Sequence, residues 1–269
     1  MLNSSFFELS CSRISRYNSR VRDEPTVLLL HGVQSNRTTW WRVGQDLADL
    51  GWRVLAIDML GHGGRVGPRT STVETLANDV LDQVHGHRVD LIAGHSLGAI
   101  VALKVVALRQ GRVRGVAIED PPGANGTLDL DAVATELEAA VVRSREDPAA
   151  EVTRLLDSHP RWATDDARRL VASRCSLNVD QVGAFLRANH WDLPELVAAS
   201  PVPVHLLAAA ADESALREPD RGTLLGALGP ARVSQIAGGH CLHRDRPALW
   251  LNTVLTFAES LDLRAARRE

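Results

Sequence analysis

Residues 89–98 read Val-Asp-Leu-Ile-Ala-Gly-His-Ser-Leu-Gly, and an alanine-rich apolar stretch follows them. The first five residues have the character of a buried strand, and the residues after Gly98 have that of a helix. At such a bend a serine has a strained backbone that exposes its hydroxyl, and glycines two residues to either side prevent Cβ clashes between strand and helix. Ser96 is therefore the candidate nucleophile.

Short apolar runs alternate along the chain with stretches of helical periodicity. Val73, Leu76 and Val80, for example, recur at spacings of three and four residues, as on the apolar face of a helix. Apolar strands that alternate with helices are typical of a parallel sheet covered on both faces. We therefore predict an α/β fold with a mostly parallel central sheet. The expected strands are residues 27–30, 54–57, 89–93, 113–118, 202–207 and 233–236, and the expected helices include 42–50, 72–84 and 247–261.

The pattern changes between residues 121 and 200, where no strand-like run is present and charged helical stretches such as 130–145 and 149–156 take over. Pro121-Pro122-Gly123 opens this segment and Pro201-Val202-Pro203 closes it, and such breakers suit a boundary. We predict a core formed by residues 1–120 and 201–269, with residues 121–200 inserted as a helical cap.

The composition limits the classes of partner. A chain of 269 residues with a net charge of −3 suits one large α/β domain with an inserted subdomain and offers no basic face for nucleic acid. The cysteines, Cys11, Cys175 and Cys241, lack the spacing of a disulfide framework or a zinc site. The sequence has no apolar run typical of a signal peptide or a membrane span. We expect a cytoplasmic monomer or homodimer with no nucleic-acid or membrane partner.

A serine hydroxyl is a poor nucleophile at neutral pH, so acyl transfer needs a base within reach and a third group that orients the base. His240 follows the last predicted strand on a glycine-containing loop, which favours it over His243 as the base. Asp212 follows the strand 202–207 and lies 28 residues before His240, so we expect its carboxylate at the same edge of the sheet. The chain order Ser, Asp, His predicts a catalytic triad.

With these motifs the chain resembles the α/β-hydrolase superfamily over residues 25–120 and 201–261. In that family a strand ending in His-Gly precedes a loop that helps to form the oxyanion hole, and residues 30–34, Leu-His-Gly-Val-Gln, match it. The resemblance implies an oxyanion hole made by the N–H groups of Val33 and Leu97. It places Asp212 at the family's acidic position, but this chain has Ala209 where the family usually has glycine. Because some members take the acid from the end of the preceding strand, Asp120 is the alternative.

The resemblance implies a serine hydrolase that cleaves a small carboxylic ester, thioester or lactone through an acyl-enzyme, without a metal or organic cofactor. Trp162 and Trp191 of the predicted cap, with His95 beside the nucleophile, are expected to line the pocket for this small-molecule substrate. A carbon–carbon bond hydrolase, a biosynthetic lyase or cyclase, and a non-hydrolytic binding protein are the alternatives on the same scaffold.

Overall fold

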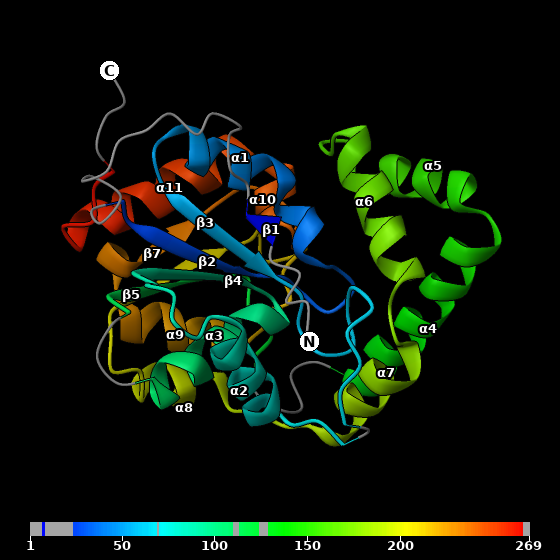
Figure 1. Cartoon of the computed structure of the whole chain (residues 1–269), viewed down its shortest axis with the longest axis horizontal. Helices are drawn as coiled ribbons and strands as arrows, with labels where there is room; N and C mark the ends of the chain where they lie inside the picture. The colour runs from blue at the N-terminus through cyan, green and yellow to red at the C-terminus, as the bar shows by residue number, and fades with distance from the viewer. Residues whose placement is uncertain (1–6, 9–23, 69, 110–112, 124–128, 266–269) are drawn as a thin grey trace.

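Six short apolar segments form the parallel strands of one central sheet (Figure 1). The computed structural model describes residues 7–8, 24–68, 70–109, 113–123 and 129–265. The strands are β1 (Phe7–Glu8), β2 (Thr26–Leu30), β3 (Arg53–Ile57), β4 (Leu91–His95), β5 (Gly115–Glu119), β6 (Val204–Ala208) and β7 (Val233–Gln235). Their order is β1-β3-β2-β4-β5-β6-β7, and β1 alone runs antiparallel to its neighbour. The predicted α/β class is confirmed.

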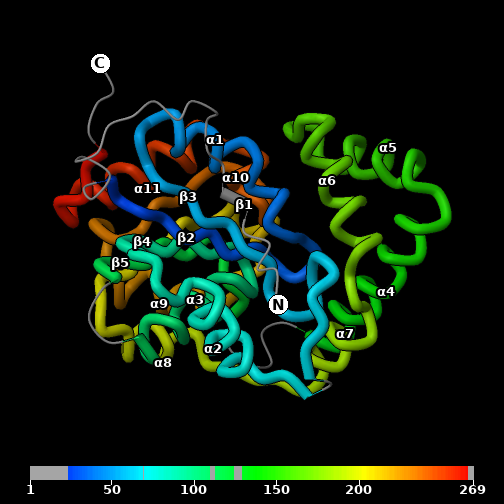
Figure 2. The backbone as a smooth tube through the Cα atoms, in the orientation of Figure 1, coloured from blue at the N-terminus to red at the C-terminus, as the bar shows by residue number. Residues whose placement is uncertain are grey.

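Helices cover both faces of this sheet. Val27 and Leu29 of β2 join one apolar cluster, and Leu28 and Leu30 join another, because successive side chains of a strand point to opposite faces. The first cluster also contains side chains of α1 (Trp41–Asp49), α10 (Leu242–Asp245) and α11 (Pro247–Ser260). The second contains side chains of α2 (Val73–Gln83), α3 (Leu97–Leu108), α8 (Leu193–Ala198) and α9 (Asp220–Leu228). Figure 2 shows α1 and α11 on one side of the strands, with α2, α3 and α8 on the other. Two short 3-10 helices, η1 (Arg37–Trp40) and η2 (Pro230–Arg232), complete these layers.

Between β5 and β6 the described part of the chain is helical. Four helices lie beyond the carboxyl ends of the strands (Figure 1), and we call them the four-helix layer: α4 (Leu130–Glu146), α5 (Pro148–Ser158), α6 (Thr164–Cys175) and α7 (Val179–Ala188). The side chains of Asp129, Asp147 and Asn178 accept N–H groups at the starts of α4, α5 and α7. The next helix, α8, packs against α3 and α9 instead. Within the described ranges, no helix combines the length and apolar character needed to cross a bilayer.

The turn at Ser96 depends on two glycines. Strand β4 runs two residues further than the predicted strand, to His95, so Ser96 itself makes the turn into α3, with φ 53° and ψ −119°. A Cβ atom on Gly94 would lie 2.3 Å from the carbonyl oxygen of Gly98, and one on Gly98 would lie 2.2 Å from that of Leu30. These neighbours are backbone atoms, so they cannot rotate away. The strand and the helix approach this closely because both positions are glycine.

We predict that Gly98→Ala lowers the free energy of unfolding by about 3 kcal/mol or more, since the added methyl group forces α3 away from β2. Gly226 of α9 is the matched control, because a Cβ there meets no atom within 4 Å. Gly226→Ala should raise stability by up to about 1 kcal/mol through its higher helix propensity. Urea unfolding followed by circular dichroism measures both changes. A Gly98→Ala protein as stable as the wild type would contradict the close approach described here.

Candidate active site

Ser96 and Asp120 occupy equivalent places at the ends of two adjacent strands. His95 of β4 pairs with Glu119 of β5, so each of the two residues is the first after its strand. The N–H of Ser96 donates to the carbonyl of Glu119 (2.9 Å), and the N–H of Asp120 donates to that of Leu207 in β6 (2.9 Å). In the described ranges only three non-glycine residues have a positive φ, and Ser96 (53°) and Asp120 (39°) are two of them. Backbone strain of this kind concentrates at functional sites.

The carboxylate of Asp120 holds the imidazole of His240. His240 Nδ1 lies 2.7 Å from Oδ2 of Asp120, whose side chain has no exposed surface. Asp120 also accepts the N–H groups of Ala215 (2.8 Å) and Ala209 (3.3 Å) and the hydroxyl of Ser214. A carboxylate can only accept, so Nδ1 of His240 is the donor in this contact, and the neutral tautomer that fits it has Nε2 as an acceptor.

Asp212, ranked first as the partner of His240 in the sequence analysis, does not have this contact. It is exposed and lines the cavity described below. The family resemblance assigned the acid to Asp212 through Ala209, at the position where the family usually has glycine. In the structure the N–H of Ala209 donates to Asp120. After Ala209 the chain turns, with a hydrogen bond from Glu213 N–H to the Ala210 carbonyl (3.0 Å). This turn leaves the side chain of Asp212 exposed and out of contact with His240. The contact belongs to the alternative acid, Asp120.

The loop after β2 passes close to Ser96. A Cβ on Gly32 would lie 3.2 Å from Cβ of Ser96, so the absence of a side chain at Gly32 lets the loop reach Ser96. The next residue is Val33, and a ring nitrogen of the buried His62 lies 3.0 Å from its carbonyl oxygen, which fixes the orientation of that segment. Leu97 supplies the first N–H of α3, which has no acceptor within the helix. The predicted oxyanion residues therefore lie on the two segments that border Ser96.

A second buried network lies behind the site. Glu119 accepts the N–H of His243 (3.0 Å), Nδ1 of His243 (2.8 Å) and Nε1 of Trp250 (2.8 Å). His95 contacts the backbone carbonyl of His240 through Nε2 (3.0 Å), and its pKa lies well below the ordinary value, chiefly because it is buried. His243, the alternative base of the sequence analysis, thus belongs to this buried network, and the cavity lining contains His240 instead.

The side chains of His95, Glu119 and His243 form the one group of potential metal ligands found in the described ranges, with ligand atoms within 4.8 Å of one another. All three are buried. Both oxygens of Glu119 already accept hydrogen bonds from His243 and Trp250. The group therefore fits a hydrogen-bonded support for the active-site loops better than a cation site.

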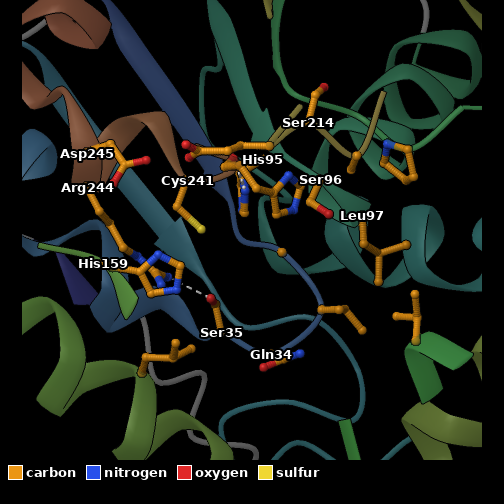
Figure 3. A pocket seen from close by; sticks show the side chains of 18 of the residues that line it. Gln34, Ser35, His95, Ser96, Leu97, His159, Ser214, Cys241, Arg244 and Asp245 are labelled. Carbon is orange, nitrogen blue, oxygen red and sulfur yellow. Dashed lines mark hydrogen bonds between the residues drawn. The ribbon is translucent and has the colours of Figure 1, made fainter. Parts of the chain in front are cut away.

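Ser96, Leu97 and His240 line a cavity of about 440 Å³ beneath the four-helix layer (Figure 3). Ser96 is 8% exposed. Among the described residues no hydrogen bond joins Ser96 Oγ to His240, whose ring packs against that of His95 at a centroid distance of 4.6 Å. Catalytic hydrogen bonds are often long or poorly aligned before substrate binds. The arrangement brings a serine hydroxyl, an oriented imidazole and backbone N–H groups to one cavity.

Both tryptophans predicted to line a pocket are found in the lining of this cavity, as is His95. The indole N–H of Trp162 donates to Asp245 (2.9 Å) and that of Trp191 to the carbonyl of Pro122 (3.2 Å). Several polar side chains of the lining were not expected from the sequence, among them His159, Arg174 and Arg244. The first two lie in the segment predicted as a helical cap. Arg244 lies four residues after His240, which was the signal available for it in the sequence.

Cys241 lies beside His240 in the cavity lining. Burial raises the pKa of its thiol to about 12, so the thiol stays protonated near neutral pH and is a poor nucleophile. Cys175 is exposed and free, and Cys11 lies outside the described residues.

The model of the α/β-hydrolase family matches residues 27–253. A 2-succinyl-6-hydroxy-2,4-cyclohexadiene-1-carboxylate synthase of Klebsiella pneumoniae is 29% identical over 239 residues, which cover 83% of this chain and 90% of that protein. The structure of an E-2-(acetamidomethylene)succinate hydrolase superposes with a TM-score of 0.68 at 22% identity, covering 88% of this chain and 92% of the other. An enol-lactonase from Burkholderia xenovorans gives a TM-score of 0.67 at 20% identity, covering 90% and 94%. These two structures support the fold, and the family model covers most of the sequence. The chain therefore belongs to the α/β-hydrolase family.

Proposed function

We propose that the protein is a serine hydrolase that cleaves a small carboxylic ester, thioester or lactone through an acyl-enzyme on Ser96. The observation that carries this proposal is the hydrogen bond between His240 and the buried Asp120, on the cavity that also contains the strained Ser96. An imidazole oriented in this way is a general base for a serine hydroxyl.

In the proposed reaction Nε2 of His240 takes the proton of Ser96 as Oγ attacks the substrate carbonyl carbon. The negative charge that develops on the carbonyl oxygen is stabilised by the N–H groups of Val33 and Leu97. Collapse of the tetrahedral intermediate breaks the bond to the leaving group, which receives the proton from His240. A water molecule, deprotonated by the same imidazole, then attacks the acyl carbon and releases the acid and the free Ser96 hydroxyl.

We propose that the four-helix layer acts as the cap of this site. It contributes the apolar side chains of Leu130, Leu155 and Leu170 to the cavity, and Trp162 lies between two of its helices. A cavity of about 440 Å³ with such a lining suits a small substrate. The enol-lactonase similarity is compatible with an ester-like bond as the target.

A lyase is the second candidate, because the synthase relative from Klebsiella pneumoniae aligns over 83% of this chain. The two candidates differ in the fate of water. Hydrolysis through an acyl-enzyme in H₂¹⁸O places one labelled oxygen in the acid product, whereas elimination forms its product without label. Mass spectrometry of the product separates the two.

We predict that Ser96→Ala reduces kcat/KM for a short 4-nitrophenyl ester by about 10⁴-fold or more, because the attacking atom is lost. A fluorophosphonate should label the wild-type protein once per chain, at Ser96, and leave the variant unlabelled. Intact-protein and peptide mass spectrometry measure the labelling. Folded wild-type protein that neither reacts with the reagent nor turns over esters would support a non-hydrolytic binding protein and contradict the proposal.

The choice of acid gives a separate prediction. Asp120→Asn should reduce kcat/KM by about 10³- to 10⁴-fold, since an amide at this place no longer stabilises the imidazolium and favours the wrong tautomer. Asp212→Asn is the matched control, with an expected change below about threefold, because Asp212 is exposed and not in contact with His240. Steady-state kinetics on variants with wild-type circular dichroism spectra test this. The reverse ranking of the two variants would return the role to Asp212.

A further inference from the structure

Arg244 is a buried cation for which the described residues supply no ionic partner. Its side chain is 1% exposed, yet none of the ion pairs among the described residues includes it. Nη2 donates to the hydroxyl of Ser35 (2.8 Å), Nε is buried without a partner, and Nη1 makes no hydrogen bond to a described residue. Removing a guanidinium from water without a counter-charge is costly, so a buried unpaired arginine calls for an explanation.

The surroundings of Arg244 leave its hydrogen-bonding edge available. Its Cζ lies 4.9 Å from the ring centroid of Trp162, so one face of the guanidinium is against an aromatic ring. The carboxylate of its neighbour Asp245 makes hydrogen bonds to other groups: Oδ1 accepts the indole N–H of Trp162, and Oδ2 accepts the N–H of Gly239. A guanidinium stacked in this way still presents its in-plane N–H groups to an anion.

Arg174, the other buried arginine of the cavity lining, is in a different state. Its Nη1 lies 2.6 Å from Glu151, and its Nε donates to the side-chain oxygen of Gln34 (2.9 Å). Arg174 thus has an ionic partner, which Arg154 and Arg143 also contact. Among the described residues of the lining, Arg244 is the buried arginine that lacks one.

We infer that Arg244 and Ser35 form a subsite for a carboxylate of the substrate, so that the ester, thioester or lactone cleaved here carries a second, anionic group. This inference rests on the proposed hydrolase function. The guanidinium supplies charge-assisted N–H donors and the serine hydroxyl is a further donor, and together they match the oxygens of a carboxylate.

The position of the subsite limits the length of the substrate. Ser35 is two residues after Val33 in the loop that turns through a hydrogen bond from Ser35 N–H to the Gly32 carbonyl (3.1 Å). Two residues span at most about 7 Å, so the backbone at Ser35 lies within about that distance of the backbone at Val33. In Figure 3, Ser35 and His159 lie below Cys241, with a dashed line marking the hydrogen bond to Ser35, and Ser96 and Leu97 lie to its right. A half-ester of a short dicarboxylic acid, of roughly six carbons, spans this distance.

The test compares matched esters that differ in one charge. Mono(4-nitrophenyl) adipate and methyl 4-nitrophenyl adipate place the carboxylate or its methyl ester on the acyl side, and 4-acetoxybenzoate and its methyl ester place it on the alcohol side. The wild-type protein should prefer the anionic member of at least one pair. Arg244→Gln should lower kcat/KM for that member by about 30-fold or more and change the neutral member by less than about threefold. Arg114→Gln, at an exposed arginine that precedes β5 and lies outside the cavity lining, is the matched control and should leave both values within about threefold.

A binding measurement tests the subsite without turnover. Adipate should bind Ser96→Ala protein in calorimetry and adipamide should not, and adding Arg244→Gln should weaken adipate binding by about 30-fold or more. If Arg244→Gln does not fold, Ser35→Ala replaces it, with an expected loss of about tenfold. Equal kcat/KM for both members of both pairs, or equal binding of adipate and adipamide, overturns the subsite. Absence of turnover of all four esters by the wild-type protein, with adipate still bound through Arg244, overturns the hydrolase function alone.

Discussion

The left-handed backbone at the ends of β4 and β5 is the constraint on which the rest of the site depends. Parallel pairing of His95 with Glu119 places Ser96 and Asp120 side by side at the same edge of the sheet, and a positive φ at both residues turns the chain sharply there. An extended backbone would continue each strand instead of turning there. The strain is maintained by the buried strands on either side and by the glycines that let α3 approach β4.

His240 is held from two directions. Asp120, one of the two strained residues, contacts its ring, and His95, the neighbour of the other, contacts its backbone carbonyl, so both the side chain and the main chain of His240 are fixed. Behind them Glu119 joins β5 to His243 of α10 and Trp250 of α11. Because these groups are buried, losing one partner would leave another polar group unsatisfied, which makes the support cooperative. The loop that carries His240 is thereby fixed although it has no regular secondary structure.

The sequence predicted the sheet well, because strands such as 27–30 and 54–57 are apolar throughout and their neighbours have helical periodicity. Ser96 and His240 were predicted from a strand-to-helix glycine pattern and from the place of a loop after the last strand. The sequence ranked Asp212 above Asp120 although both follow strands, because the backbone conformation that brings the Asp120 carboxylate to the imidazole is not visible in it. Arg244 was missed because the burial of a charged side chain depends on tertiary packing against Trp162 and Ser35.

A crystal structure of the protein after reaction with an aryl phosphonate tests the central claim most directly. The account predicts a bond from Ser96 Oγ to phosphorus, a phosphonyl oxygen within hydrogen-bonding distance of the N–H groups of Val33 and Leu97, and His240 still bonded to Asp120. A phosphonate attached to a different side chain, or an imidazole that has turned to Asp212, would contradict it.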